Sequence, residues 1–117
     1  MANKDKPQVV LPGTLDLMVL QTLQTLGPQH GYAIAARLEQ VSGGALQLNM
    51  GTLYPSLMRL EQRGLVCGDW GVTGNNRKAR FYSLTVAGRK RLKEETQSWN
   101  RFAEAVAAAM KTRPGEI

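Results

Sequence analysis

Cysteine and histidine are nearly absent from this chain, and their scarcity excludes several classes of protein. Among 117 residues there is one cysteine, Cys67, and one histidine, His30. No disulfide can form within the chain, which fits a reducing compartment. One Cys and one His supply neither a zinc site nor a nucleophile–base pair. We therefore expect no metal, no cofactor and no enzymatic activity. Cys67 is expected to pack as a small apolar residue on a strand, and His30 to serve in a loop or as a helix cap.

Long apolar runs are also missing. No segment contains the ~20 consecutive apolar residues that a membrane-spanning helix needs, and residues 1–7 lack the apolar core of a signal peptide. These features predict a cytoplasmic protein with no membrane partner.

Acidic residues are few, with 9 Asp and Glu against 15 Lys and Arg, a formal net charge of +6. The segment 77–93 holds seven basic residues and no acidic one. This excess favours a polyanionic partner such as nucleic acid, although a basic run can also be an ordinary solvated surface.

The apolar pattern predicts a mainly α (α+β) chain. We expect residues 1–13 to form a flexible arm, with Thr14 capping a helix that starts at Leu15 and ends at Gly27-Pro28. A second helix is expected over 31–42, and a third from between Asn49 and Thr52 to about Arg63. Between them, residues 45–48 are expected to form a short extended segment that could pair as a strand. Strands over 65–72 and 79–84 would form a hairpin around the polar turn 73–78.

Thr85 is expected to cap a long last helix over 86–111. Its residues 92, 96, 99, 103, 106 and 110 repeat with spacings 4, 3, 4, 3 and 4, as in a coiled-coil seam. Such a helix is ~39 Å long, more than a small domain covers, so a second copy is expected to pack on its far half. The predicted homodimer interface comprises Leu92, Trp99, Phe102, Ala103, Val106 and Met110. Trp99 and Phe102 could anchor this interface or line a pocket for a flat hydrophobic effector.

The order helix, helix, helix, hairpin is typical of a winged helix-turn-helix, whose third helix enters the DNA major groove. Leu53, Leu57 and Leu60 are expected in the core, with Pro55 in or near the first turn of this helix. The opposite face would carry hydrogen-bonding and cationic side chains that can reach base edges and phosphates. An ordinary solvated face fits the same residues equally well. The predicted contacts to double-stranded DNA are Thr52, Tyr54, Pro55, Ser56 and Arg59 on the helix, with Asn76, Arg77, Lys78 and Arg80 on the hairpin.

Four segments resemble the PadR family of bacterial regulators: LPGTLDLMVLQTL (11–23), HGYAIAARLEQ (30–40), GTLYPSLMRLEQRGLV (51–66) and RFYSLTVAGRKRL (80–92). The resemblance extends from residue 11 to 110, and the brief C-terminal region is similar to the subfamily with a single dimerisation helix. It implies a winged-helix homodimer that represses transcription from a palindromic operator.

The resemblance also assigns roles to residues. Tyr54 matches the family's tyrosine on the recognition helix, and Arg77, Lys78 and Arg80 match its basic wing and following strand. Trp99 falls where some members carry an aromatic residue that lines an effector pocket. Family effectors include phenolic acids and flat multidrug compounds, and many members have no known ligand.

The expected domain organisation is an arm over 1–13, a winged helix-turn-helix over 14–84, a dimerisation helix over 85–112 and a disordered tail over 113–117. A sequence-specific DNA-binding repressor is the predicted function. The alternative is a winged-helix module that binds proteins without specific DNA recognition, because fold alone does not decide function.

Overall fold

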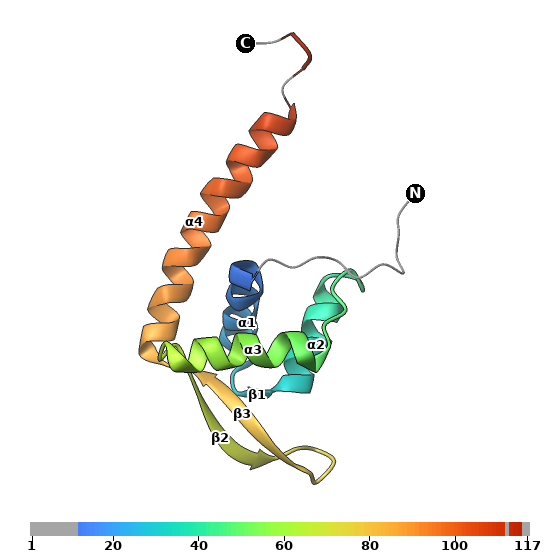
Figure 1. Cartoon of the computed structure of the whole chain (residues 1–117), viewed down its shortest axis with the longest axis vertical. Helices are drawn as coiled ribbons and strands as arrows, with labels where there is room; N and C mark the ends of the chain where they lie inside the picture. The colour runs from blue at the N-terminus through green and yellow to red at the C-terminus, as the bar shows by residue number, and fades with distance from the viewer. Residues whose placement is uncertain (1–11, 112, 116–117) are drawn as a thin grey trace.

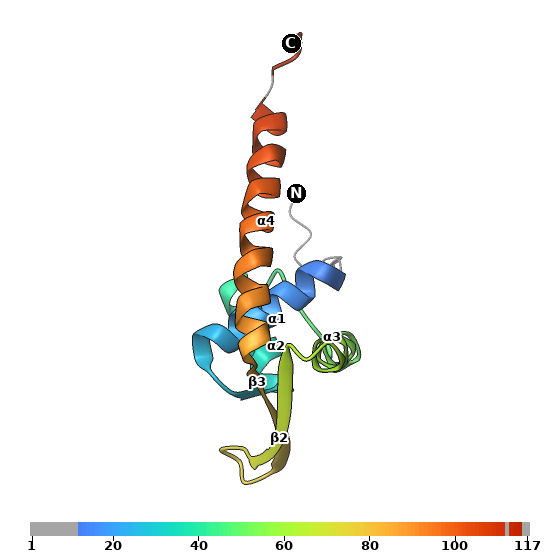
Figure 2. The same ribbon diagram turned by 90° about the vertical axis from the view of Figure 1, so that its left-hand side faces the viewer.

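Three helices pack at one end of a small antiparallel sheet, and a fourth helix runs away from this body (Figures 1 and 2). The computed structural model describes residues 12–111 and 113–115. The elements are α1 (Pro12–Leu26), β1 (Gln29–His30), α2 (Gly31–Val41), α3 (Met50–Gln62), β2 (Val66–Val72), β3 (Lys78–Leu84) and α4 (Val86–Lys111). This is the predicted winged helix-turn-helix with a long C-terminal helix. None of the described helices is both long enough and apolar enough to cross a membrane.

Side chains cap the N-termini of α2, α3 and α4, as the sequence predicted. The Asn49 Oδ1 accepts a hydrogen bond of 2.9 Å from the Thr52 backbone N–H, so Asn49 is the cap of α3. His30 Nδ1 accepts from the Ala33 N–H and caps α2. Thr85 Oγ1 accepts from the Gly88 N–H at 2.9 Å and donates to the Gly64 carbonyl, which joins the start of α4 to the end of α3.

The end of α3 is closed by a backbone motif that needs glycine. Gly64 has φ of 72°, and its N–H bonds the Glu61 carbonyl while the next N–H, of Leu65, bonds the Leu60 carbonyl. These two bonds form a Schellman motif, which requires a left-handed residue at this position. The chain therefore leaves α3 in one fixed direction and enters β2 directly.

Three local predictions about the helices and the sheet are wrong. Helix α1 starts at Pro12 and not at Leu15, because a proline in the first turn of a helix sacrifices no intrahelical hydrogen bond. The rest of the predicted arm, residues 1–11, lies outside the described residues. Pro55 lies in the second turn of α3, where its ring nitrogen cannot donate to the Gly51 carbonyl.

The third local error concerns the sheet. Residues 45–48 do not pair as a strand, because the Leu46 N–H donates to Ser42 Oγ at the end of α2. The strand that joins the hairpin of β2 and β3 is β1. Its Gln29 and His30 lie opposite Tyr82 and Phe81 of β3. The strand order is β1-β3-β2, with both neighbours of β3 antiparallel to it.

The core lies between α1, α2, α3, the base of the hairpin and the start of α4. Leu53, Leu57 and Leu60 are fully buried, as their spacing predicted. Leu92 is also in this core, 6% exposed, so the prediction that it contributes to a dimer interface is wrong. Cys67 is exposed, because the alternation along β2 turns its neighbour Val66 inward.

Most of α4 extends beyond this core. Its only buried residues among those described are Gly88 and Leu92, both in its first two turns. Four large apolar side chains follow on the outer part and remain exposed, namely Trp99, Phe102, Val106 and Met110. Of the predicted C-terminal tail, residues 113–115 are described, and 114–115 form a turn.

Gly88 is expected to be the least replaceable glycine of the body. A Cβ added there would lie 2.0 Å from the Leu65 carbonyl oxygen, a backbone atom that cannot turn away. Gly88→Ala should therefore lower the free energy of unfolding by about 3 kcal/mol, measured by urea titration at a fixed protomer concentration. Gly13→Ala is the matched control, because its Cβ would meet open space on α1. Equal stability of the two variants would contradict the close packing of α4 on Leu65.

Candidate nucleic-acid interface

The exposed face of α3 holds most of the polar residues that were predicted to contact DNA, but not all of them. Of the predicted contacts on this helix, Thr52, Tyr54 and Pro55 are exposed, and so are Gln62 at its end and the C-cap residue Arg63. Ser56 is completely buried, so its prediction as a DNA contact is wrong. Its position lies on the edge of the leucine face, one residue before Leu57 and four before Leu60, and it packs toward α1.

A carboxylate from α1 accounts for this burial. Ser56 Oγ donates to Asp16 Oδ1 at 2.5 Å, and Arg59 donates to the same carboxylate from Nη2 at 2.9 Å and from Nε at 3.3 Å. The hydrogen bond to Asp16 raises the pKa of Arg59 above its usual value, against the opposing effect of desolvation. Two of the five N–H groups of Arg59 point to Asp16, and the other three remain for a ligand.

The ring of Tyr54 packs on the start of α2. A Cβ added at the buried Gly31 would lie 3.4 Å from Cζ and from the hydroxyl oxygen of Tyr54. The tyrosine nevertheless stays 40% exposed. The ring of Tyr54 therefore contributes to the packing of α3 on α2, while the predicted contact of Tyr54 with DNA stays a prediction.

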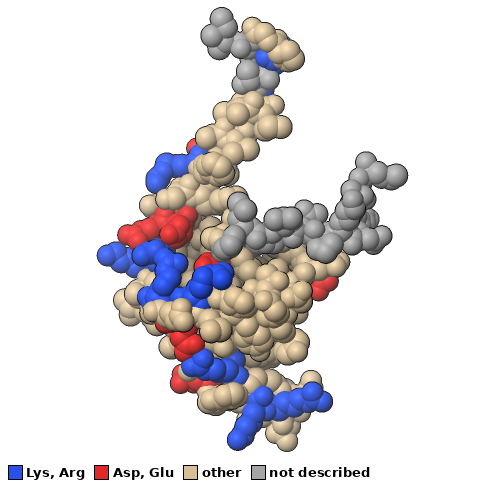
Figure 3. Space-filling view, viewed as in Figure 1, with Lys and Arg blue, Asp and Glu red and all other residues tan. Residues whose placement is uncertain are grey.

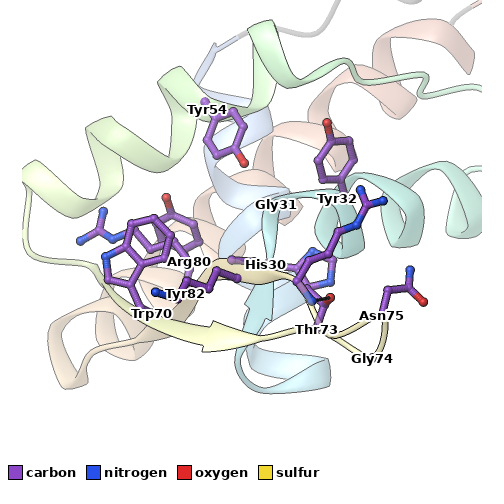
Figure 4. Close-up of a pocket in the computed structure, with 13 residues that line it drawn as sticks. His30, Gly31, Tyr32, Tyr54, Trp70, Thr73, Gly74, Asn75, Arg80 and Tyr82 are labelled. Carbon is purple, nitrogen blue, oxygen red and sulfur yellow. Dashed lines mark hydrogen bonds between the residues drawn. The ribbon is translucent and has the colours of Figure 1, made fainter.

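A groove of about 780 Å³ lies between α3, the start of α2 and the wing, which comprises β2, β3 and the turn between them. Figure 4 shows Tyr54 directed from α3 toward this groove, with the wing turn on its other side. Hydrogen-bonding and cationic groups line it, including His30, Tyr32, Thr73, Asn75, Arg77 and Lys78. The groove is thus walled by the two elements that the sequence assigned to DNA.

The wing turn is basic and exposed. Asn76 has φ of 59° and donates its N–H to the Thr73 carbonyl, a left-handed conformation that asparagine tolerates. Arg77 and Lys78 follow it with exposed side chains. Figure 3 shows Lys and Arg side chains at this end of the molecule, and further basic side chains mixed with acidic ones near the base of α4.

Arg80 differs from its two basic neighbours. It lies on the same face of the sheet as Tyr82, two residues along β3, with its guanidinium 5.6 Å from the centre of that ring. Its two terminal nitrogens donate to both oxygens of Glu61 at 2.7 and 2.6 Å. These hydrogen bonds are the main cause that raises the pKa of Arg80.

Three residues that form or support this surface were not predicted from the sequence. Met58 lies on the solvent face of α3, 58% exposed, and Tyr32 lines the groove. Asp16 was missed although a signal existed, because a carboxylate between Leu15 and Leu17 within an apolar stripe predicts a buried polar contact.

The predicted effector residues lie together on α4. The rings of Trp99 and Phe102 have centroids 6.2 Å apart and are tilted by 45°. Trp99 is 44% exposed and Phe102 61% exposed in the single chain. The pair offers an aromatic surface on the part of α4 that the core does not cover.

The chain matches known proteins over this whole architecture. In the solved structures, it resembles a PadR family transcriptional regulator from Eggerthella lenta, with 30% identity, a TM-score of 0.73, and 86% of this chain and 85% of the other covered. Among protein sequences, it is 32% identical to a transcriptional regulator of Mycobacterium tuberculosis, over 66% of this chain and 71% of that protein.

This chain is also 42% identical to an uncharacterized protein of a Streptomyces fradiae transposon. The match covers 68% of this chain and 21% of that protein. The family model of the PadR-like transcriptional regulators matches residues 19–94, from within α1 to the first turns of α4. The chain therefore belongs to the PadR-like family of transcriptional regulators.

Proposed function

We propose that this regulator is a homodimeric repressor that binds a palindromic operator and releases it when a flat hydrophobic effector enters the dimer interface. The observation that carries the DNA-binding part is the groove between α3 and the basic wing turn. In the proposed complex α3 lies in the major groove, and Arg77 and Lys78 contact phosphates of the adjacent backbone. Thr52, Tyr54, Pro55 and Arg59 face the DNA from α3, and Asn76 from the wing turn.

The second copy is proposed to pack along the outer part of α4. A helix that exposes Trp99, Phe102, Val106 and Met110 on one side, with Ala103 half-buried among them, has an apolar stripe without a partner in the single chain. Pairing of two such helices places the two α3 helices at a fixed separation, and a palindromic site has matching half-sites.

The effector is proposed to act through the same interface. A molecule between the two Trp99–Phe102 pairs would favour a dimer whose α3 helices no longer fit the half-site spacing. It can release DNA only to the extent that it binds that arrangement more tightly than the DNA-bound one. The alternative, a protein-interaction module, would show a protein partner and no operator binding.

Operator binding is tested by fluorescence anisotropy with a duplex from upstream of the protein's own gene and a shuffled duplex, at several salt concentrations. Arg59→Ala should weaken binding to the selected duplex by about 1–3 kcal/mol with little effect on the shuffled one. Lys78→Gln should weaken both and reduce the salt slope by about 1, because one phosphate contact is lost. Lys111→Gln, at the far end of α4, is the charge-matched control. An unchanged slope for Lys78→Gln would mean that the wing touches no phosphate.

Dimerisation is tested with Val106→Glu. Two like charges brought into an apolar interface lose their hydration without gaining a partner, so the variant should sediment as a monomer where the parent is a dimer. Gln97→Glu places the same charge on another side of α4 and should leave the dimer intact. A dimeric Val106→Glu variant would exclude this stripe as the interface.

Effector binding is tested by titrating a Trp70→Phe variant, in which Trp99 is the remaining tryptophan, with p-coumaric acid and with a planar aromatic dye. A binding effector should change Trp99 emission and lower operator affinity over the same concentration range. A change in emission with unaltered operator affinity would show binding without regulation and would contradict the proposed release mechanism.

A further inference from the structure

The Glu61–Arg80 pair connects the recognition helix to the wing. Glu61 lies near the end of α3 and Arg80 in the third position of β3, 19 residues later. The guanidinium meets the carboxylate with two hydrogen bonds, from Nη1 to Oε1 at 2.7 Å and from Nη2 to Oε2 at 2.6 Å. It also reaches the Gly68 carbonyl at 3.4 Å and lies over the ring of Tyr82. All these contacts hold the planar fork in one orientation.

Gly68 supplies the space for this arrangement. It lies directly opposite Tyr82 on the neighbouring strand, on the same face of the sheet as Arg80. A Cβ at this position would lie 2.8 Å from both Cζ and Nε of Arg80. Alanine at position 68 therefore displaces the guanidinium, while the charge of the chain stays the same.

The pair matters because it holds the wing further out than its other contacts with the body, which are the packing at its base, the pairing with β1 and the ring of His30 against Phe81. Val66 and Tyr82 are its buried residues, and both lie near its base. Strand β1 pairs only with Phe81 and Tyr82. Among the hydrogen bonds and ion pairs of the described wing residues, those of Arg80 are the outermost that reach a helix of the body. Figure 4 shows Arg80 beside Tyr82 and Trp70 at this position, with the wing turn further out.

We infer that Arg80 is a positioning residue that holds the wing at a fixed angle to α3 through Glu61, and not a phosphate ligand. The inference rests on the proposed function, since the angle matters for a protein that inserts α3 and the wing into one duplex. With the angle fixed, Arg77 and Lys78 reach the backbone at a defined distance from the bases that α3 contacts. Without it, the cations would remain but their register with α3 would be lost.

The effect of Glu61→Gln on DNA affinity distinguishes a positioning role of Arg80 from a purely electrostatic one, because the two predict opposite directions. Glu61→Gln removes a negative charge near DNA and frees Arg80, so electrostatics and a phosphate-binding Arg80 both predict tighter binding. Loss of the wing angle predicts weaker binding to the operator, by about tenfold. Asp69→Asn is the matched control, because it makes the same charge change on the opposite face of the wing and should not weaken binding.

Two further variants leave the net charge unaltered. Arg80→Lys keeps the cation but lacks the fork that meets both carboxylate oxygens, so it should lose about as much affinity as Glu61→Gln. Gly68→Ala should do the same by displacing Arg80, whereas Gly74→Ala, with open space around its Cβ, should not. Adding Arg80→Gln to Glu61→Gln should cost little beyond either single change, because both remove one interaction.

A measurement without DNA keeps this inference separate from the proposed function. The chain has two tryptophans, so an NMR spectrum of the indole N–H groups contains two signals, and Trp70→Phe assigns that of Trp70. Trp70 lies directly opposite Arg80 on the adjacent strand. Its signal should move in Glu61→Gln and Gly68→Ala but not in Asp69→Asn or Gly74→Ala.

If the parent selects no duplex, the proposed function fails while the Trp70 signal still decides whether the pair fixes the wing. If Glu61→Gln binds the operator as tightly as the parent or more tightly, and Arg80→Lys binds like the parent, Arg80 is a phosphate ligand and the inference is overturned. An unmoved Trp70 signal in both Glu61→Gln and Gly68→Ala also overturns it.

Discussion

Asp16 carries a carboxylate within the apolar face of α1, and the orientation of α3 depends on it. The residue is 8% exposed. A carboxylate removed from water is strongly unfavourable unless hydrogen bonds and an opposite charge replace its hydration. Ser56 and Arg59 supply both, and they lie three residues apart on one side of α3. The leucines of α3 would accept small rotations, since apolar packing has little directional preference. The fixed geometry of the hydrogen bonds to Asp16 leaves α3 one rotation, and this rotation decides which residues it presents to solvent.

The cationic side chains discussed for the candidate interface form two groups. The first is held by carboxylates, and the second is exposed on the wing turn. Asp16 holds Arg59, and Glu61 holds Arg80, each with two hydrogen bonds. The cations of the wing turn, Arg77 and Lys78, are exposed. The uninterrupted basic run from 77 to 93 therefore overstates the positive charge that is available to a polyanion. In the proposed complex, the exposed Arg77 and Lys78 contribute the binding energy from phosphates, whereas the paired Arg59 and Arg80 fix the geometry in which the surface meets DNA.

The sequence predicted the order of the elements and the core of α3 because both follow from local chemistry. Asn49, Thr85 and Gly64 mark helix ends through bonds to residues a few positions away, and the leucine spacing defines a buried face. The errors have a different origin. The pairing of Gln29 and His30 with β3 joins positions some 50 residues apart, and no local pattern marks a two-residue strand. Ser56 and Leu92 were misassigned because their partners, Asp16 and the core of the same chain, come from distant segments.

Helix α1 provides the connection between the interface of the proposed dimer and the proposed DNA surface. It packs against both α4 and α3. Leu92 of α4 and Leu57 of α3 belong to one continuous core with Val19 of α1. Close-packed side chains have low compressibility, so in the proposed mechanism a rotation of α4 at its base is transmitted to α1. The Asp16 contacts then carry a movement of α1 to α3. In the proposed mechanism an effector at Trp99 therefore needs only to change how two α4 helices cross, because the shared core and the Asp16 contacts already connect α4 to α3 within each chain.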